Sequence, residues 1–198
     1  MQIQQDSFVV YRPCPLVCFN SSVEKLSSIF SKRCVVTEMI PYPKLIRDGI
    51  LWVDSHGVQC NGRAGYLLAI DKKTVYPEYQ NHLYETDTKT YLPSACLPEM
   101  FDVHKSIIIL DNCYSSEVSI DTLTKWKDNM IFTTGYIKDY YDSQSTDMIK
   151  AIEVVMERLS KEKGISHLTY RIVKENKDFI NKVFAEINAK YKTQYNLF

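Results

Sequence analysis

The stretch Ser106-Ile107-Ile108-Ile109-Leu110-Asp111-Asn112-Cys113 decides the predicted fold. Four consecutive aliphatic residues between polar ones are too short for a globular helix and too unbroken for a half-exposed strand. They predict a central parallel strand that is buried on both faces. Because functional groups gather at the carboxyl ends of strands in open α/β sheets, Asp111 and Cys113 stand where a site is expected.

A second strand of the same kind is predicted upstream, over residues 50–54, and is followed by His56 and Gly57. If the two strands are neighbours, His56 and Cys113 emerge at the same edge of the sheet as a base and a nucleophile. A lone strand-end cysteine is usually a small buried hydrophobic residue, and a lone histidine is usually structural. The presence of both at matching strand ends favours a functional pair.

These residues resemble the motifs of the caspase-like cysteine peptidases, the superfamily of caspases, metacaspases, separases and bacterial CHAT domains. The matching segments are Trp52-Val53-Asp54-Ser55-His56-Gly57-Val58 and Ile107-Ile108-Ile109-Leu110-Asp111-Asn112-Cys113-Tyr114-Ser115. Between them, residues 65–75 resemble the small hairpin that follows the histidine in this family. The likeness covers roughly residues 8 to 160. Asn112 replaces the usual small residue before the cysteine, and Ser116 replaces a glycine often found after Cys-x-Ser.

The resemblance implies hydrolysis of peptide bonds by a dyad of His56 and Cys113, with no third acid. The Cys113 thiolate is the expected nucleophile, and His56 is the expected acid and base. By the family pattern, the backbone amides of Gly57 and Cys113 form the oxyanion hole. In metacaspase-like relatives an acid two residues before the cysteine binds the basic residue before the scissile bond. Asp111 has that position, and Asp54 is a second candidate for the same pocket.

Other interpretations of the aspartates near the strand ends remain open. A strand-end aspartate such as Asp111 often caps local backbone instead of binding a ligand. Asp139 and Asp142 could extend an acidic rim, but a surface loop also explains them. Three further histidines belong to no motif, and we expect no catalytic role for His82, His104 and His167.

Composition limits the class of protein and its partners. The chain has 198 residues, with 24 basic and 24 acidic side chains, and this length suits one α/β domain. The resemblance implies that residues 1–198 form a single caspase-like peptidase domain. Balanced charge argues against nucleic-acid and membrane partners, and the polar N-terminus does not resemble a signal peptide, so we expect a soluble, cytoplasmic protein. Cys14 and Cys18 lack the second ligand pair of a zinc site. We therefore expect no metal and no cofactor, and free thiols at Cys14, Cys34, Cys60 and Cys96.

Periodicity along the chain predicts the order of elements. The expected strands are one of residues 8–11 and 16–19 (the second being preferred), 34–40, 50–54, 107–111, 130–135 and an edge strand at 168–173. The expected helices cover residues 20–32, 43–47 (short), a short stretch from about 98, 118–127, 147–164 and 174–191. This order predicts a doubly wound, mainly parallel α/β sheet of about five to six strands flanked by helices. The resemblance implies that this sheet has the caspase-like arrangement.

The sequence leaves three functional hypotheses. The first is a cysteine endopeptidase that cuts protein or peptide substrates after Arg or Lys. A protein activator or inhibitor, or cleavage within 84–91 or 136–146, would control it. The second is a catalytically silent caspase-like scaffold. The third is a receiver-like or nucleotide-binding domain, which the absence of a glycine-rich phosphate loop disfavours.

Overall fold

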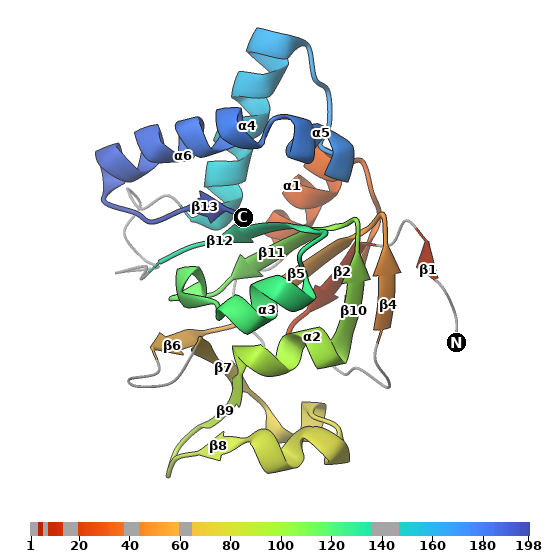
Figure 1. The fold of residues 1–198 in the computed structure, drawn as a ribbon, viewed down its shortest axis with the longest axis vertical. Helices are drawn as coiled ribbons and strands as arrows, with labels where there is room; N and C mark the ends of the chain where they lie inside the picture. Colours follow the sequence, from red (N-terminus) through yellow and green to blue (C-terminus); the bar gives the residue numbers. More distant parts are fainter. Residues whose placement is uncertain (1–3, 6–7, 14–19, 38–43, 60–64, 136–146) are drawn as a thin grey trace.

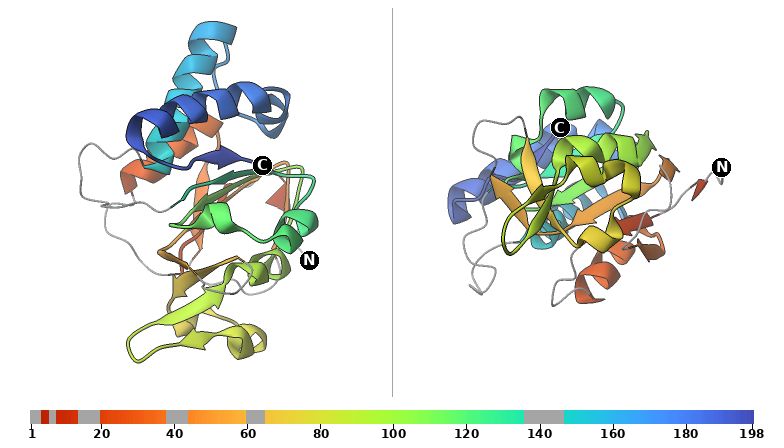
Figure 2. Two further views of the ribbon diagram at one scale, coloured as in Figure 1. Left: turned by 60° about the vertical axis from the view of Figure 1, so that its left-hand side comes forward. Right: turned by 90° about the horizontal axis from the view of Figure 1, so that it is seen from below.

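The computed structural model describes residues 4–5, 8–13, 20–37, 44–59, 65–135 and 147–198. A six-stranded sheet crosses the middle of the molecule, with helices on both of its faces (Figure 1). A small antiparallel sheet extends away from one end, as Figure 1 and the left view in Figure 2 show. The predicted α/β class with a mainly parallel central sheet is confirmed.

The central sheet has the strand order β13-β12-β11-β5-β2-β3. Its strands are β2 (Phe8–Tyr11), β3 (Cys34–Thr37), β5 (Ile50–Asp54), β11 (Ile107–Asp111), β12 (Met130–Thr133) and β13 (Asn196–Leu197). All neighbours are parallel except β13, which runs antiparallel to β12. The aliphatic run that ends at Asp111 is β11, and it lies between β5 and β12 with all five residues buried. Its prediction as a central buried strand is confirmed.

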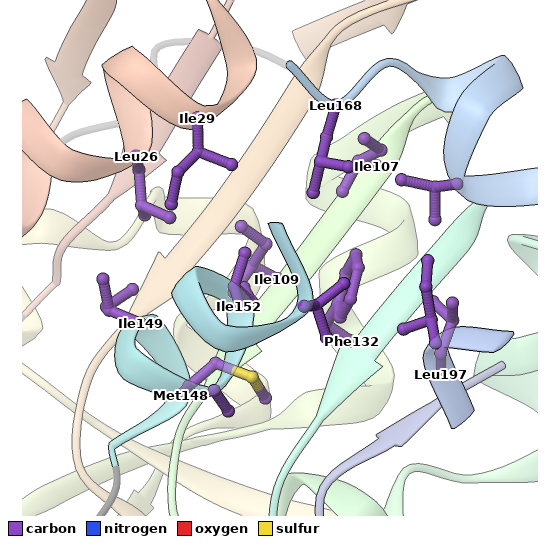
Figure 3. Close-up of a cluster of buried hydrophobic side chains, with 14 of the residues drawn as sticks. Leu26, Ile29, Ile107, Ile109, Phe132, Met148, Ile149, Ile152, Leu168 and Leu197 are labelled. Atoms are coloured by element: carbon purple, nitrogen blue, oxygen red, sulfur yellow. The ribbon is translucent and has the colours of Figure 1, made fainter. Parts of the chain in front are cut away.

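Helices α1, α4, α5 and α6 cover one face of this sheet (Figure 1). Their bounds are Asn20–Phe30, Met148–Lys163, Tyr170–Glu175 and Lys177–Tyr191. Ile107 and Ile109 of β11 and Phe132 of β12 point into this layer (Figure 3), where they meet Leu26 of α1 and Ile152 of α4. The core on this face therefore joins both halves of the chain.

The amphipathic helix α4 begins and ends where the sequence indicates. The Asp147 side chain accepts a hydrogen bond from the Lys150 backbone N–H, which caps the first turn. Gly164 has φ +67° and ends the helix in the left-handed conformation that glycine adopts at little cost. This part of the prediction is confirmed.

The opposite face of the sheet carries α2 (Leu97–Met100), α3 (Ile120–Lys125) and the small antiparallel sheet. Ile108 and Leu110 of β11 pack on this side with Tyr66 and Trp126. The small sheet has the order β6-β7-β9-β8, with strands Gly57–Gln59, Tyr66–Ile70, Thr90–Pro93 and Tyr84–Glu85. Because the side chains of β11 point alternately into two buried layers, the sequence of this strand is a continuous apolar run.

The predicted hairpin after His56 exists, but with different strands. Residues 66–70 form β7, as the pattern indicates, and β7 pairs antiparallel with β6 directly after His56. The segment Lys72–Thr74 is a short 3-10 helix capped by the Asp71 side chain, and not the second strand of the hairpin. A second 3-10 helix, Pro77–His82, leads toward β8.

A third sheet corrects the prediction for residues 43–47. Lys44–Arg47 is strand β4, which pairs in parallel with β10 (Phe101–His104) and with β1 (Gln4–Gln5). The short run did not reveal this because its partner β10 lies more than fifty residues away in sequence. Tertiary pairing decided the conformation here, as it often does for short segments.

Two further predictions change. Residues 168–173 do not form an edge strand, because the Thr169 side chain caps helix α5 by accepting from the Ile172 N–H. Of the two segments considered for the first strand, Phe8–Tyr11 is a strand of the central sheet and pairs with β3 and β5, whereas the preferred segment 16–19 lies outside the described residues. Within the described part of the chain, none of the helices has the length and apolarity needed to cross a bilayer.

Candidate functional site

The register of two neighbouring strands brings His56 and Cys113 together. Every pair in the β5–β11 ladder joins residues 57 positions apart in sequence, the last being Asp54 and Asp111. His56 and Cys113 have the same separation and follow that last pair by two residues. They therefore leave the sheet side by side at its carboxyl edge, with His56 exposed and Cys113 half-buried.

Gly57 lies directly against the Cys113 backbone. A Cβ atom at Gly57 would stand 1.8 Å from the carbonyl oxygen of Cys113 and 3.0 Å from its amide nitrogen. No side chain fits in that space, so glycine is required here by close approach and not by its dihedral angles. The His-Gly and Cys motifs, far apart in sequence, are in backbone contact.

The turn after Cys113 is held in an unusual conformation. Tyr114 has φ +65°, which costs a non-glycine residue roughly 1–2 kcal/mol. Its N–H donates to the Gly135 carbonyl at 3.1 Å. The buried Ser115 hydroxyl donates to the Leu110 carbonyl at 2.7 Å and accepts from the Thr134 N–H at 2.8 Å. Strain that surrounding bonds enforce in this way is frequent at functional sites.

The hairpin directs the amide of Gly57 away from β7. The His56 carbonyl accepts from the Ala69 N–H at 2.8 Å and so faces β7. The N–H of the same trans peptide, which belongs to Gly57, points in the opposite direction. In the antiparallel ladder, Gly57 and Leu68 are accordingly a non-hydrogen-bonded pair. The Gly57 N–H therefore points to the outer edge of β6, where an oxyanion donor is predicted.

Asp54 and Asp111 lie level on adjacent strands, and both are buried. Arg12, which follows β2, places its Nε 3.4 Å from Asp54 Oδ2. Burial raises the pKa of Asp54 to about 6, although the Arg12 charge acts in the opposite direction. Asp54 already has an internal cation, which weakens its candidacy as a pocket acid.

The charges around Asp111 differ from those around Asp54. Burial raises the pKa of the Asp111 carboxyl well above the usual range, and the charges of Asp54 and Asp147 raise it further, whereas the nearby Trp52 side chain acts in the opposite direction. Among the described residues, no lysine or arginine forms an ion pair with Asp111. A buried carboxyl without a cation is costly and would bind one favourably.

Two residues near Asp111 were not anticipated from the sequence. Asp147, the cap of α4, and Tyr195 both lie close enough to influence titration at this end of the sheet. Burial, followed by the charges of Asp111 and Asp147, raises the pKa of Tyr195 above its ordinary value. Nothing in the local sequence marks Tyr195, whereas Arg12 could have been found because it directly follows a strand.

Several other candidates lie elsewhere. Asp139, Asp142, Cys14, Cys18 and Cys60 fall outside the described residues, as does segment 136–146. Where the chain is described, the metal-ligating side chains form no group of three or more.

The remaining histidines and cysteines are also away from the strand-end pair. His104 is the last residue of β10 and lies between Asp102 and Asp128, at 2.8 and 3.2 Å. Cys34 and Cys96 form no disulfide within the described ranges. Their predicted role as thiols without a catalytic function stays a prediction.

A surface hollow of about 220 Å³ lies at the other edge of the sheet. Its lining includes Ile50 and Ile107, the first residues of β5 and β11, together with Lys32 and Thr169. It is therefore at the amino ends of the strands, opposite the edge that carries Cys113. It takes no part in the candidate site.

Comparison with known proteins gives no relative to set beside this geometry: no protein-family model, no curated protein and no solved structure matches the chain. The class that the fold and the site define is thus an α/β protein with a histidine and a cysteine at neighbouring strand ends and a buried acid two residues before the cysteine.

Proposed function

We propose that this chain is a caspase-like cysteine endopeptidase that cleaves after Arg or Lys. The observation that carries the proposal is the backbone contact between Gly57 and Cys113, which brings the two motifs of the resemblance to one place. The six-stranded sheet and the hairpin directly after His56 are further support for a caspase-like fold.

The proposed reaction needs only groups of the chain and water. His56 takes the proton of the Cys113 thiol, and the thiolate attacks the scissile carbonyl to form a carbon–sulfur bond. The amides of Gly57 and Cys113 stabilise the oxyanion. His56 then donates the proton to the leaving amine as the peptide C–N bond breaks. Water, deprotonated by His56, cleaves the thioester and releases the acid product and the thiol.

The preference for a basic residue follows from the charge of the buried edge. A substrate arginine or lysine beside Asp111 would neutralise a carboxylate that is otherwise desolvated without a cation among the described residues. Arginine is favoured because its guanidinium can bind a carboxylate through two parallel hydrogen bonds. Asp54 contributes less because Arg12 already pairs with it.

The test is cleavage of fluorogenic peptides that differ only in the residue before the cut. The wild type is compared with Cys113→Ala and with Cys34→Ala, which removes another half-buried thiol at the amino end of β3, on the opposite edge of the sheet. Cleavage after Arg or Lys that survives Cys34→Ala and disappears in Cys113→Ala is expected. Cleavage after aspartate would retain the peptidase and reject the role of Asp111.

If the wild-type chain cleaves none of these peptides, a labelling experiment tests whether Cys113 is reactive. A peptide probe with a thiol-reactive group and an arginine before it should label Cys113 even when turnover is slow. If the probe fails to label Cys113, the catalytically silent scaffold replaces the peptidase as the proposed function.

A further inference from the structure

Asn112 is a buried amide at the point where the two motifs meet. It is 1 % exposed and immediately precedes Cys113. Its Nδ2 group donates to the carbonyl of Ser55 at 2.9 Å and to that of Val53 at 3.3 Å. Its Oδ1 atom accepts from the Tyr66 hydroxyl at 2.9 Å. The amide thus uses its donor and its acceptor side at once.

These bonds connect three segments that are separate in sequence. Ser55 precedes His56 on one segment, Asn112 precedes Cys113 on the second, and Tyr66 opens strand β7 on the third. The β5–β11 ladder ends at Asp54 and Asp111, one residue before this point. The Asn112 side chain continues the link between the two strands after the ladder ends.

We propose that Asn112 is a positioning residue that sets the distance between His56 and Cys113. The inference rests on the proposed function, because it assigns a partner to that dyad. In the caspase-like pattern this position usually holds a small residue, which offers no such bonds. A carboxylate cannot donate to the Ser55 carbonyl, and an apolar residue can neither donate nor accept, so only an amide of this length serves all three partners.

A second contact acts in the same direction at the surface. Gln59 Nε2 donates to Glu117 Oε1 at 3.1 Å, which joins β6 to the turn after Cys113. This bond is exposed and therefore contributes little. The buried link through Asn112 is the one expected to control the geometry.

Asn129 offers a matched control. It is also a buried amide, 3 % exposed, whose Nδ2 donates to the Val103 carbonyl at 2.7 Å and whose Oδ1 accepts from the Ser106 N–H at 3.0 Å. It lies at the opposite edge of the sheet, just before β12. Removal of either amide costs stability, but only Asn112 bears on the strand ends that carry the dyad.

The test measures the rate at which iodoacetamide alkylates Cys113 as a function of pH, resolved by mass spectrometry, together with peptide kinetics. In Asn112→Ala, the pH profile of alkylation should move toward that of His56→Ala. Its kcat should fall about 10- to 100-fold with KM changed less than about 2-fold, because misplacement by a fraction of an ångström has effects of this order. Asn129→Ala should retain the wild-type profile and kcat, although it unfolds at a lower temperature.

The outcomes separate this inference from the proposed function. If wild type and His56→Ala share one alkylation profile, the dyad itself is absent and both proposals fail. If that comparison shows a dyad but Asn112→Ala keeps the wild-type profile and kcat, only the positioning role is overturned. Should Asn112→Ala not fold, Tyr66→Phe decides, since it removes one hydroxyl: a shifted profile supports the role, and an unchanged profile rejects it.

Discussion

Replacement of Asp111 by asparagine should stabilise the folded chain at neutral pH. Burial gives the folded carboxyl a raised pKa, so between the unfolded value near 3.9 and the folded value the folded state binds more protons than the unfolded state. The free energy of unfolding therefore falls as pH rises through this window. Asparagine has nearly the same shape and no charge, so the variant loses this dependence.

The neighbouring carboxyl sets the scale of the effect. The pKa of Asp54 rises from 3.8 to about 6 in spite of its ion pair with Arg12. A difference of about two units corresponds to about 3 kcal/mol. The amide of asparagine also loses hydration when buried. We therefore expect Asp111→Asn to gain roughly 1–3 kcal/mol at pH 7.5 relative to pH 4.5.

Urea unfolding at the two pH values measures this gain, with Asp54→Asn as the contrasting variant. Asp54→Asn leaves Arg12 without the carboxylate that it pairs with and should destabilise the fold at pH 7.5. Loss of stability in Asp111→Asn at pH 7.5, or a change that is equal at both pH values, would refute the description of Asp111 as a costly buried charge.

The same variant should lose its preference for basic residues. Removal of one member of a buried charge pair costs about 2 kcal/mol or more in binding, which is a fall in kcat/KM of at least about 30-fold for an arginine substrate. A substrate with an uncharged residue at that place should be affected much less. Greater stability together with lower activity would identify Asp111 as a binding group and not as a structural cap.

Three further substitutions test the geometry. Gly57→Ala puts a methyl group 1.8 Å from the Cys113 carbonyl oxygen. The variant should lower the free energy of unfolding by about 1–3 kcal/mol and kcat/KM by about 100-fold. Unchanged peptide kinetics would contradict the close approach of the two backbones. Ser115→Ala leaves buried partners, among them the Thr134 N–H, without a hydrogen bond and should lower the free energy of unfolding in urea by about 1–3 kcal/mol. A change below about 0.5 kcal/mol would contradict the structural role of the Ser115 hydroxyl. Ile120→Lys, at a side chain that is 80 % exposed, should change stability by less than about 0.5 kcal/mol, and a larger loss would mean that this end of α3 is covered in solution.

The elements that the sequence predicted well are those whose pattern is decided locally. Strand β11 is an uninterrupted aliphatic run buried in two layers, and α4 has a cap at each end around a regular apolar stripe. The strands β4 and β10 were missed because each is short and depends on the other for its hydrogen bonds. The apolar residues of helix α5 are adjacent in sequence, which is typical of a strand, and the cap at Thr169 is the local signal that favours a helix.

For the candidate site, too, the sequence predicted the part that depends on local pattern and not the part that depends on packing. His56 and Cys113 follow apolar runs, and parallel pairing of those runs brings the two residues together without any further information. The surroundings of the pair depend on packing between distant segments. Tyr66 reaches Asn112 across the hairpin, and Tyr195 approaches Asp111 from the C-terminal part of the chain, and no local pattern encodes either contact.

The distance in space between His56 and Cys113 does not depend on how many residues lie between them in sequence. Five ladder pairs between β5 and β11 hold the alignment, so the long connection between those strands can vary in length without moving either reactive side chain. The turn at residues 86–89 is exposed, and its ends are joined by bonds from Thr86 N–H to the Lys89 carbonyl and from Lys89 N–H to the Thr86 hydroxyl. A sensory domain or a recognition peptide inserted at that turn would leave the sheet intact. Insertions could therefore be accommodated there, by evolution or by engineering, while His56 and Cys113 keep their positions at the strand ends.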